Sequence, residues 1–593
     1  MKRKEICKQL CVGLVLILSL TLVFSCQTNK SDSVDQDFER YKDTFIESIW
    51  KLNPSWAMYV GYHKYDSVLL VPDSNYLVSQ VATYESLLNE LKKIDEGSLN
   101  QNNKVDYWMM RDFVLSSLWY AKEFKSHEWN PAVYNVGGEF AEILNGRFAT
   151  LDERMRSVFL RMQNVPHYYQ VAESNISNPT KEHTELAILQ NKGALSIFGT
   201  SLIDSLNVCK NLSDREKEEF KSRINLTTAS IEKYIHFLER LNSSINETNS
   251  KSFRIGKEAY FKKFEHDIQS AYTADALYKK AIERKKELHT KMGELAEQLW
   301  PKYFSDTQKP SDSKKMIRLI IDTIASSHCH RDSFQLEIEK QIPELEKFIN
   351  EKNLLYLDPS KPLVVRKTPE YMEGSGAGAS INSPGPYDKG ANTYYNVSPL
   401  DGYTNKAAES YLREYNNYTL QILNIHEAIP GHYTQLVYSN NAPSMIKSIL
   451  GNGSMIEGWA VYGERMMLEE GYGNNNPELW MMYYKWHLRT VCNTILDFCV
   501  HTLNMTKEEG LDLLVNEAFQ EQAEAENKWR RVTLSQVQLC SYFNGYSEIY
   551  DLRETLKLNS KEFDLKNFHE TFLSFGSAPV KYISLLMKSE KTK

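Results

Sequence analysis

The sequence predicts a mostly helical protein, and three observations lead to this prediction. Between about residues 37 and 353, apolar residues recur at three- and four-residue spacing, as in Tyr84–Leu91. The long segment Ala276–Leu299 is rich in Glu and Lys at distances that pair on a helix surface. After residue 400 the helical pattern resumes and continues to the end of the chain. We therefore expect one large multi-helix body.

The segment between residues 362 and 400 has a different character. Leu363–Val365 and Thr393–Val397 are rich in β-branched and aromatic residues, which favour strands. Gly374–Gly385 is rich in Gly, Ser and Pro and predicts a loop. A small β-hairpin or sheet is thus expected before a candidate metal-binding helix near residues 407–440. It is either a structural hairpin or an edge strand that holds an extended peptide.

Size and charge narrow the class of protein. The chain has 593 residues, an apolar content of 42% and a formal net charge of −7. Its sequence pI is about 6.1. This content is sufficient for a substantial core, and the acidic balance argues against nucleic acid as a partner.

The amino terminus predicts a bacterial lipoprotein signal. A basic start at residues 2–4 is followed by an apolar stretch over residues 10–24 and then by Cys26, the expected lipidation site. A plain signal peptide or a membrane anchor is the alternative. The predicted organisation is a signal peptide at 1–25, a polar tether at 26–37 and a body at 38–593. Within the body we expect a helical half over about 38–355 and a catalytic half over about 356–593. The mature protein is expected in the cell envelope, lipid-anchored to the inner or outer membrane and facing the periplasm or the exterior.

The segment His426-Glu-Ala-Ile-Pro-Gly-His432 predicts a zinc site. Histidine is the usual nitrogen ligand of zinc, and a Glu beside the first His is the usual general base of a zinc hydrolase. Six residues of regular helix would rotate by about 600°, which leaves the two side chains about 120° apart. Pro430 and Gly431 lie where the helix would have to break for both imidazoles to reach one ion.

A zinc hydrolase needs a third protein ligand, and Glu457 is the candidate. It follows His432 closely enough for one helix to end, for a loop to turn at residues 451–453, and for a second helix to return. Glu464 lies on the same face as Glu457 and is expected to accept a hydrogen bond from a ligating His. Glu427 is expected to act as the general base. Alternatively, these carboxylates are ordinary helix-surface residues.

Together these motifs resemble those of the bacterial domain-of-unknown-function 885 (DUF885) family, a group of zinc metallopeptidase-like proteins. The family pattern HExxPGH, followed by a Gln, matches His426–His432 and Gln435. The pattern E-G-W-A-x-Y-x-E matches Glu457–Glu464. Two carboxy-terminal patterns match as well, at Gln538, Ser541, Tyr542, Gly545, Leu552 and Arg553, and at Phe568, His569, Leu573 and Gly576. The resemblance runs from about residue 38 to the end.

The resemblance implies a metallopeptidase-like helical body with a deep cleft. It implies that His426, His432 and Glu457 bind one zinc ion per chain and that Glu427 is the base. Many members carry an Arg upstream of an Asp-x-x-x-His segment. Here that segment matches Asp497 and His501, whereas the upstream position is an Asn.

Two further roles are expected near the zinc. Tyr542 is the candidate for stabilising the oxyanion, with His501 as a rival for this role. Arg553, or Arg530 and Arg531, is the candidate for holding a substrate carboxylate. The alternatives are a core tyrosine and arginines at helix ends or on the surface.

The leading hypothesis is a zinc peptidase that cleaves short peptides outside the cytoplasm. The alternative is a non-catalytic peptide- or nutrient-binding lipoprotein, which would have no need for a base such as Glu427 beside a metal ligand. A third hypothesis is a structural zinc protein. Structural sites commonly fill their positions with Cys, and no Cys lies near the motif.

Overall fold

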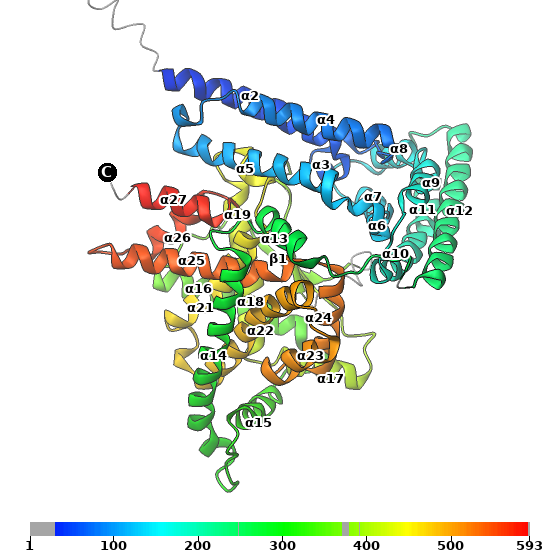
Figure 1. Cartoon of the computed structure of the whole chain (residues 1–593). Helices are drawn as coiled ribbons and strands as arrows, with labels where there is room; N and C mark the ends of the chain where they lie inside the picture. Colours follow the sequence, from blue (N-terminus) through cyan, green and yellow to red (C-terminus); the bar gives the residue numbers. More distant parts are fainter. Residues whose placement is uncertain (1–29, 247, 370–378, 389, 391, 591–593) are drawn as a thin grey trace, which may run out of the picture.

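Helices dominate the structure (Figure 1), a computed structural model that describes residues 30–246, 248–369, 379–388, 390 and 392–590. Within these residues, one small three-stranded sheet precedes the helices that carry the predicted zinc site. The predicted fold class, mostly α with a small sheet in this position, is confirmed. The signal peptide and Cys26 lie outside the described residues.

The helices fall into three runs along the chain. The first run comprises α2 (Lys30–Leu52), α3 (Pro54–Tyr59), α4 (Ser74–Leu91), α5 (Gln101–Trp119), α6 (Ser126–Trp129), α7 (Gly137–Asn145), α8 (Leu151–Met162), α9 (Val165–Asn175), α10 (Lys181–Ala194), α11 (Thr200–Val208) and α12 (Asp214–Ser244). The second comprises α13 (Gly256–Asp267), α14 (Ala274–Tyr303), α15 (Ser313–Ala325) and α16 (Phe334–Lys352). The third, after the sheet, comprises α17 (Asn405–Glu414), α18 (Thr419–Glu427), α19 (His432–Asn440), α20 (Met445–Ile449), α21 (Gly453–Glu469), α22 (Pro477–Thr502), α23 (Lys507–Asp512), α24 (Gln522–Leu534), α25 (Ser541–Leu558), α26 (Leu565–Ser574) and α27 (Val580–Glu590).

Two large hydrophobic cores hold most of these helices together, and a third, small cluster consists of Trp119, Phe124 and Trp129. The larger core joins α2, α4 and α5 to the second and third runs, and the smaller core lies among α7 to α12. Figure 1 shows α7 to α12 gathered at one side of the molecule, away from α14 and α22. The predicted division near residue 355 stays a prediction, although helices from both sides of it, such as α14 and α22, pack on each other.

The start of the folded body differs from the prediction. Residues 30–37, expected to form part of a polar tether, begin α2. Phe38 follows and is fully buried in the larger core. The polar residues that suggested a tether are equally compatible with the solvent side of a helix, and sequence composition alone does not distinguish the two.

The sheet has the strand order β1-β3-β2. Strands β1 (Leu363–Lys367) and β3 (Thr393–Val397) match the two predicted strands, but they pair in parallel and so do not form a hairpin. Strand β2 (Ala379–Asn382) lies in the segment predicted as loop and pairs antiparallel with β3. The peptide-holding role considered for this sheet stays a prediction, and β2 is an outer strand that contacts α18.

The sheet also supports the helix that carries the first histidine. Tyr395, at the centre of β3, is fully buried. Its hydroxyl donates a hydrogen bond of 2.8 Å to Oδ1 of Asn424 in α18. Asn424 in turn donates to Oε1 of Gln341 in α16 at 2.7 Å. These two consecutive side-chain hydrogen bonds link α18 to the sheet on one side and to α16 on the other.

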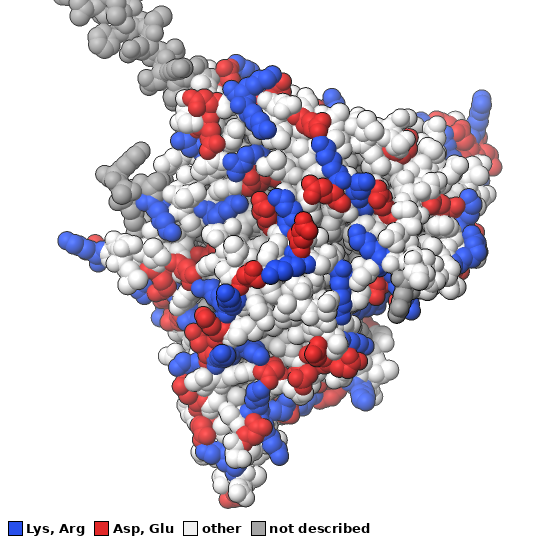
Figure 2. All heavy atoms as spheres, viewed as in Figure 1, with Lys and Arg blue, Asp and Glu red and all other residues white. Residues whose placement is uncertain are grey.

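The surface is of mixed charge. On the face shown in Figure 2, Lys and Arg side chains are interspersed with Asp and Glu among uncharged residues. Among the described residues, no helix combines the length and the apolar character that crossing a bilayer requires.

Candidate metal centre

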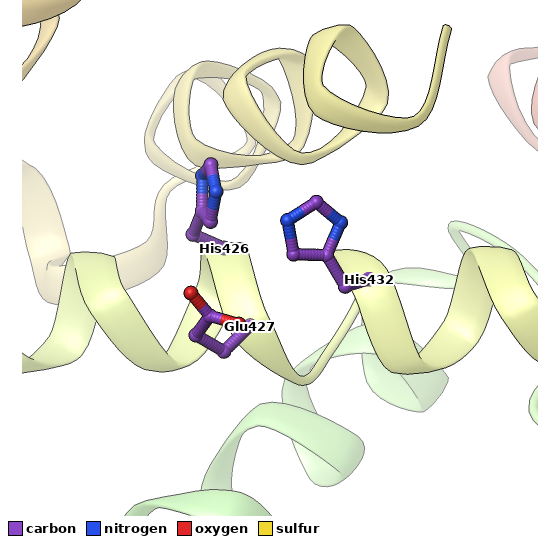
Figure 3. A group of neighbouring side chains, drawn as sticks. All are labelled: His426, Glu427 and His432. Carbon is purple, nitrogen blue, oxygen red and sulfur yellow. The ribbon is translucent and has the colours of Figure 1, made fainter. Parts of the chain in front are cut away.

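The two histidines come from the facing ends of two helices (Figure 3). Helix α18 ends at Glu427 and α19 begins at His432, so the single metal helix expected over 407–440 is divided into α17, α18 and α19. Residues 428–431 form the connection, in which the Ile429–Pro430 peptide bond is cis. The break predicted at Pro430 and Gly431 is thus confirmed. It lets His426 and His432 project to the same side, with ring centroids 4.7 Å apart.

Hydrogen bonds fold the connection back over the end of α18. The amide of Gly431 donates to the carbonyl of Ile425 at 3.0 Å, and the amide of Ala428 donates to that of Asn424 at 2.9 Å. These bonds satisfy carbonyl groups that the end of a helix leaves open. The indole of Trp459 in α21 donates to the carbonyl of Pro430 at 2.7 Å and ties the connection to the neighbouring helix.

Gly431 is required by close approach of the backbone. A Cβ atom at this position would lie 1.8 Å from the carbonyl oxygen of His426 and 2.4 Å from that of Ile425. Its backbone angles, φ −69° and ψ −132°, lie outside the α and β regions that residues with a Cβ favour. The expectation that this Gly adopts angles that other residues avoid therefore agrees with the structure, and the lack of room for a side chain is a second reason for glycine here.

Three ligand atoms converge on one point between α18, α19 and α21. Oε2 of Glu457 lies 3.7 Å from Nε2 of His426 and 3.4 Å from Nε2 of His432. Ligands at about 2.0–2.1 Å from a tetrahedral zinc ion are separated by roughly 3.4 Å. Two imidazoles and one carboxylate are also a donor set that catalytic zinc uses, with the fourth position open. The residues present therefore fit a zinc ion.

Glu464 orients the first ligand. This fully buried carboxylate accepts a hydrogen bond of 2.7 Å from Nδ1 of His426 and another of 3.0 Å from the indole of Trp486. With a proton kept on Nδ1 by Glu464 and a metal ion in place of the proton on Nε2, the lone pair of Nε2 would point toward Glu457 and His432. Glu457 and Glu464, seven residues apart on α21, thus contact the same imidazole from two sides.

The electrostatics of the centre favour a cation. Burial lowers the pKa of His426, but hydrogen bonds to Glu457 and Glu464 outweigh burial and raise it to about 10. Burial raises the pKa of Glu457, yet the two imidazoles more than offset this and hold it well below its usual range. Both shifts reflect the attraction between imidazolium and carboxylate charges in a buried place, and a divalent cation bound there would take over the role of the imidazolium charge.

Glu427 lies beside the ligands. One ligand-type atom from each of His426, Glu427 and His432 lies within 4.8 Å of the other two. Burial raises the pKa of the Glu427 carboxyl group, and the charges of His432 and His426 act in the opposite direction. A carboxyl group with a raised pKa next to a metal centre is suited to accepting and returning a proton near neutral pH.

The sequence model of the family "Bacterial protein of unknown function (DUF885)" matches residues 54–587. This chain belongs to the DUF885 family. A solved structure of a candidate lipoprotein of unknown function from Shewanella oneidensis is 53% identical, with a TM-score of 0.86 over 93% of this chain and 99% of that chain. A candidate lipoprotein from Colwellia psychrerythraea is 16% identical, with a TM-score of 0.76 over 94% of this chain and 100% of that one, and shares the fold. No curated protein matches the sequence.

In this DUF885 protein, two glycines set the position of Tyr542. Helices α21 and α25 touch through their backbones, because a Cβ on Gly545 would lie 1.7 Å from the carbonyl of Ser454, and one on Gly458 would lie 2.3 Å from Gly545 Cα. Tyr542 lies one turn before Gly545. Burial raises its pKa, with a further contribution from the charge of Glu457, so the phenol lies within electrostatic range of the centre.

The structure gives two other predicted residues of the DUF885 protein different partners. Nε2 of His501 bonds to the carbonyl of Val532 at 3.0 Å, and burial lowers its pKa to about 4. Arg553 forms ion pairs of 2.8 Å with Glu469 and Glu554. Among the described residues, no hydrogen bond or ion pair joins either side chain to the three ligands. Neighbouring groups bind both side chains, because a buried imidazole and a buried guanidinium need hydrogen-bond or ion-pair partners.

Two tryptophans of the centre were not predicted from the sequence. Trp459 lies inside the E-G-W-A motif, so the motif itself could have indicated that its indole has a role. Trp486 lies on α22 and reaches Glu464 only through the packing of α22 on α21. No local pattern in the sequence marks that contact.

Proposed function

We propose that this DUF885 protein is a zinc-dependent peptidase that hydrolyses short peptides. The observation that supports this most strongly is that Nε2 of His426 and Nε2 of His432 lie 3.7 and 3.4 Å from Oε2 of Glu457, beside the carboxyl group of Glu427. His426, His432 and Glu457 would hold the ion. Zinc supplies a Lewis acid that polarises a peptide carbonyl and makes water a nucleophile near neutral pH.

Glu427 then moves the proton. Its carboxylate takes a proton from the attacking water and gives it to the nitrogen of the leaving amine. A carboxylate of ordinary acidity is a weak base for taking a proton from water. Burial, which raises the pKa of Glu427, reduces this weakness.

We assign to Tyr542 the role of stabilising negative charge on the carbonyl oxygen. Nη2 of Arg531 donates a hydrogen bond of 3.1 Å to the phenolic oxygen, so the phenol keeps its own proton available for donation. The adjacent guanidinium charge also makes the phenol a stronger donor. Preorganised donors of this kind act most strongly on charge that develops during the reaction.

Removing and restoring the metal tests this function. The purified chain is incubated with a mixed peptide library, and the products are read by mass spectrometry. Zinc-loaded protein, with about one zinc per chain, is expected to cleave peptides, because the site has one set of three ligands. Chelated protein is expected to be inactive and to recover with zinc but not with magnesium. Cleavage that persists in metal-free protein would contradict the proposal.

A non-catalytic binding lipoprotein is the second candidate. The names of the two similar structures, both candidate lipoproteins, favour a role at the cell envelope without specifying chemistry. A binding protein would retain peptides from the same library without producing fragments. The presence of Glu427 beside the ligands favours the peptidase, because binding alone does not require a base.

We also propose that Cys26 carries a lipid that anchors the protein in the cell envelope. The signal-like amino terminus and the names of the two similar structures support this. The Cys26→Ser variant is expected to move from the membrane fraction to the soluble fraction, as read by immunoblot. Cys7→Ser, an exchange within the same amino-terminal segment, is expected to remain with the membranes. Retention of Cys26→Ser in the membrane fraction would disprove lipidation at this residue.

A further inference from the structure

A cluster of cationic side chains lies between α17, α22 and α24. Its positive members are Lys485 and Arg489 on α22 and Lys528 and Arg531 on α24, and its carboxylates are Glu414 on α17 and Glu524 on α24. Four basic side chains thus face two carboxylates within the cluster, and Glu464 of the candidate metal centre also interacts electrostatically with Arg489. A basic side chain in a partly buried place is stabilised when an anion contacts it directly.

The ion pairs within the cluster are uneven. Nζ of Lys485 forms a close hydrogen bond of 2.6 Å with Glu414, and Arg489 lies 3.4 Å from Glu524. The nearest carboxylate to Nζ of Lys528 is Glu524, at 3.8 Å, which exceeds hydrogen-bond distance. In the part of the chain that the structure describes, the buried Nη1 of Arg489 has no hydrogen-bond partner and lies 3.9 Å from Oε1 of Glu414.

Lys528 is the member whose position most requires an explanation. The residue is only 4% exposed. Burial lowers its pKa to about 7, and the charge of Arg489 contributes in the same direction. Lysines that serve only the fold usually extend their ammonium group into water. A buried ammonium group beside a second cation is instead the arrangement that recognises an anion.

The cluster borders the candidate metal centre on two sides. The guanidinium of Arg489 lies 4.7 Å from the ring centroid of Trp486, whose indole donates to Glu464, the residue that orients His426. On the other side, Arg531 donates to Tyr542, which lies within electrostatic range of Glu457. An anion held by the cluster would therefore lie next to the reacting part of a substrate.

We infer that Lys528 and Arg489, with Arg531 at the solvent side, bind the carboxy-terminal carboxylate of the peptide substrate. This inference rests on the proposed peptidase function and adds which end of the substrate is recognised. A free α-carboxylate is the anionic group that all unmodified peptides share. It can accept hydrogen bonds from a guanidinium and an ammonium at once. The protein is thus expected to act near the carboxy terminus of short peptides.

Peptides that differ only at their ends test the inference. Each sequence is supplied as free acid, as carboxy-terminal amide and as amino-terminal acetyl derivative. Amidation is expected to lower kcat/KM about 10- to 100-fold, the range for loss of hydrogen bonds to a charged group. Acetylation is expected to have little effect. Equal cleavage of acid and amide would overturn the inference while leaving the peptidase function intact.

The same comparison can be made without turnover. Binding of the acid and the amide to the zinc-loaded Glu427→Gln variant, measured by calorimetry, is expected to show the same preference for the acid. Absence of cleavage by the wild-type protein would contradict the proposed function, whereas equal affinity for acid and amide would contradict the carboxylate site. The two failures are therefore distinguishable.

Variants identify the residues. Lys528→Gln is expected to bring the acid-to-amide ratio of kcat/KM close to one while the zinc content stays that of the wild type. Arg531→Gln, at an exposed position, serves as a second variant and is expected to lower the ratio less. Lys507→Gln is the matched control, since Lys507 is exposed on α23 and pairs with Glu526. An unchanged ratio in both test variants would contradict the assignment.

Discussion

Replacing Gly431 by Ala is expected to abolish zinc binding and to destabilise the fold. The added Cβ would lie 1.8 Å from the carbonyl oxygen of His426, far inside contact distance, and the clashing atom belongs to the backbone. Relief requires the connection to move away from the end of α18. That movement breaks the Gly431 hydrogen bond to Ile425 and separates His426 from His432. Overpacking of this kind lowers stability by roughly 1–3 kcal/mol, and by more where backbone must shift.

Zinc content by mass spectrometry and unfolding in urea measure the two effects of Gly431→Ala. Gly453→Ala provides a matched control, because a Cβ at that position has no heavy atom within 4 Å. Gly453 begins α21, the helix that supplies Glu457, so the control also probes general sensitivity of the site to changes in that helix. Wild-type zinc content and stability in Gly431→Ala would show that the close approach is not required.

The residues of the candidate metal centre could be singled out from the sequence because their signals are local. The motif from His426 to His432 contains both the metal-binding side chains and their spacing. The seven-residue separation of Glu457 and Glu464 places both on one helix face. The helical fold class followed equally well from periodicity, which is a property of neighbouring residues. The need for a break near Pro430 followed from helix geometry alone.

Features that depend on contacts between distant segments were not predictable in the same way. The backbone contact of Gly458 with Gly545, which places Tyr542, joins residues of α21 and α25. For the same reason, the structure adds no support for His501 as an oxyanion donor or for Arg553 as a binder of the substrate carboxylate. Each side chain has a chemistry that suits an active site, but packing gives each of them partners elsewhere.

Errors at the edges of elements had a different origin. Strand β2 was expected to be loop because its surroundings are rich in Gly, Ser and Pro, yet pairing with β3 supplies the hydrogen bonds that its sequence does not specify. The cationic cluster around Lys528 was likewise hidden, because its members come from α17, α22 and α24, and only the fold brings them together.

Replacing Glu427 by Gln is expected to remove peptide hydrolysis while leaving zinc bound. The amide has nearly the size of the carboxylate but cannot accept a proton from water, so the loss is that of general base catalysis, about 10²- to 10⁴-fold in kcat. The ligands His426, His432 and Glu457 are untouched by the exchange. Glu409→Gln is a suitable control, since Glu409 is 56% exposed on α17 and contacts only His328 among the ion pairs of the described residues.

Zinc content and peptide turnover, measured on the same preparation of Glu427→Gln, test the central claim most directly. If Glu427 is the general base of a zinc site, the Glu427→Gln variant is expected to hold about one zinc per chain. Its turnover is expected to be at least about 100-fold below that of the wild type and of Glu409→Gln. Undiminished turnover in zinc-loaded Glu427→Gln would contradict the claim.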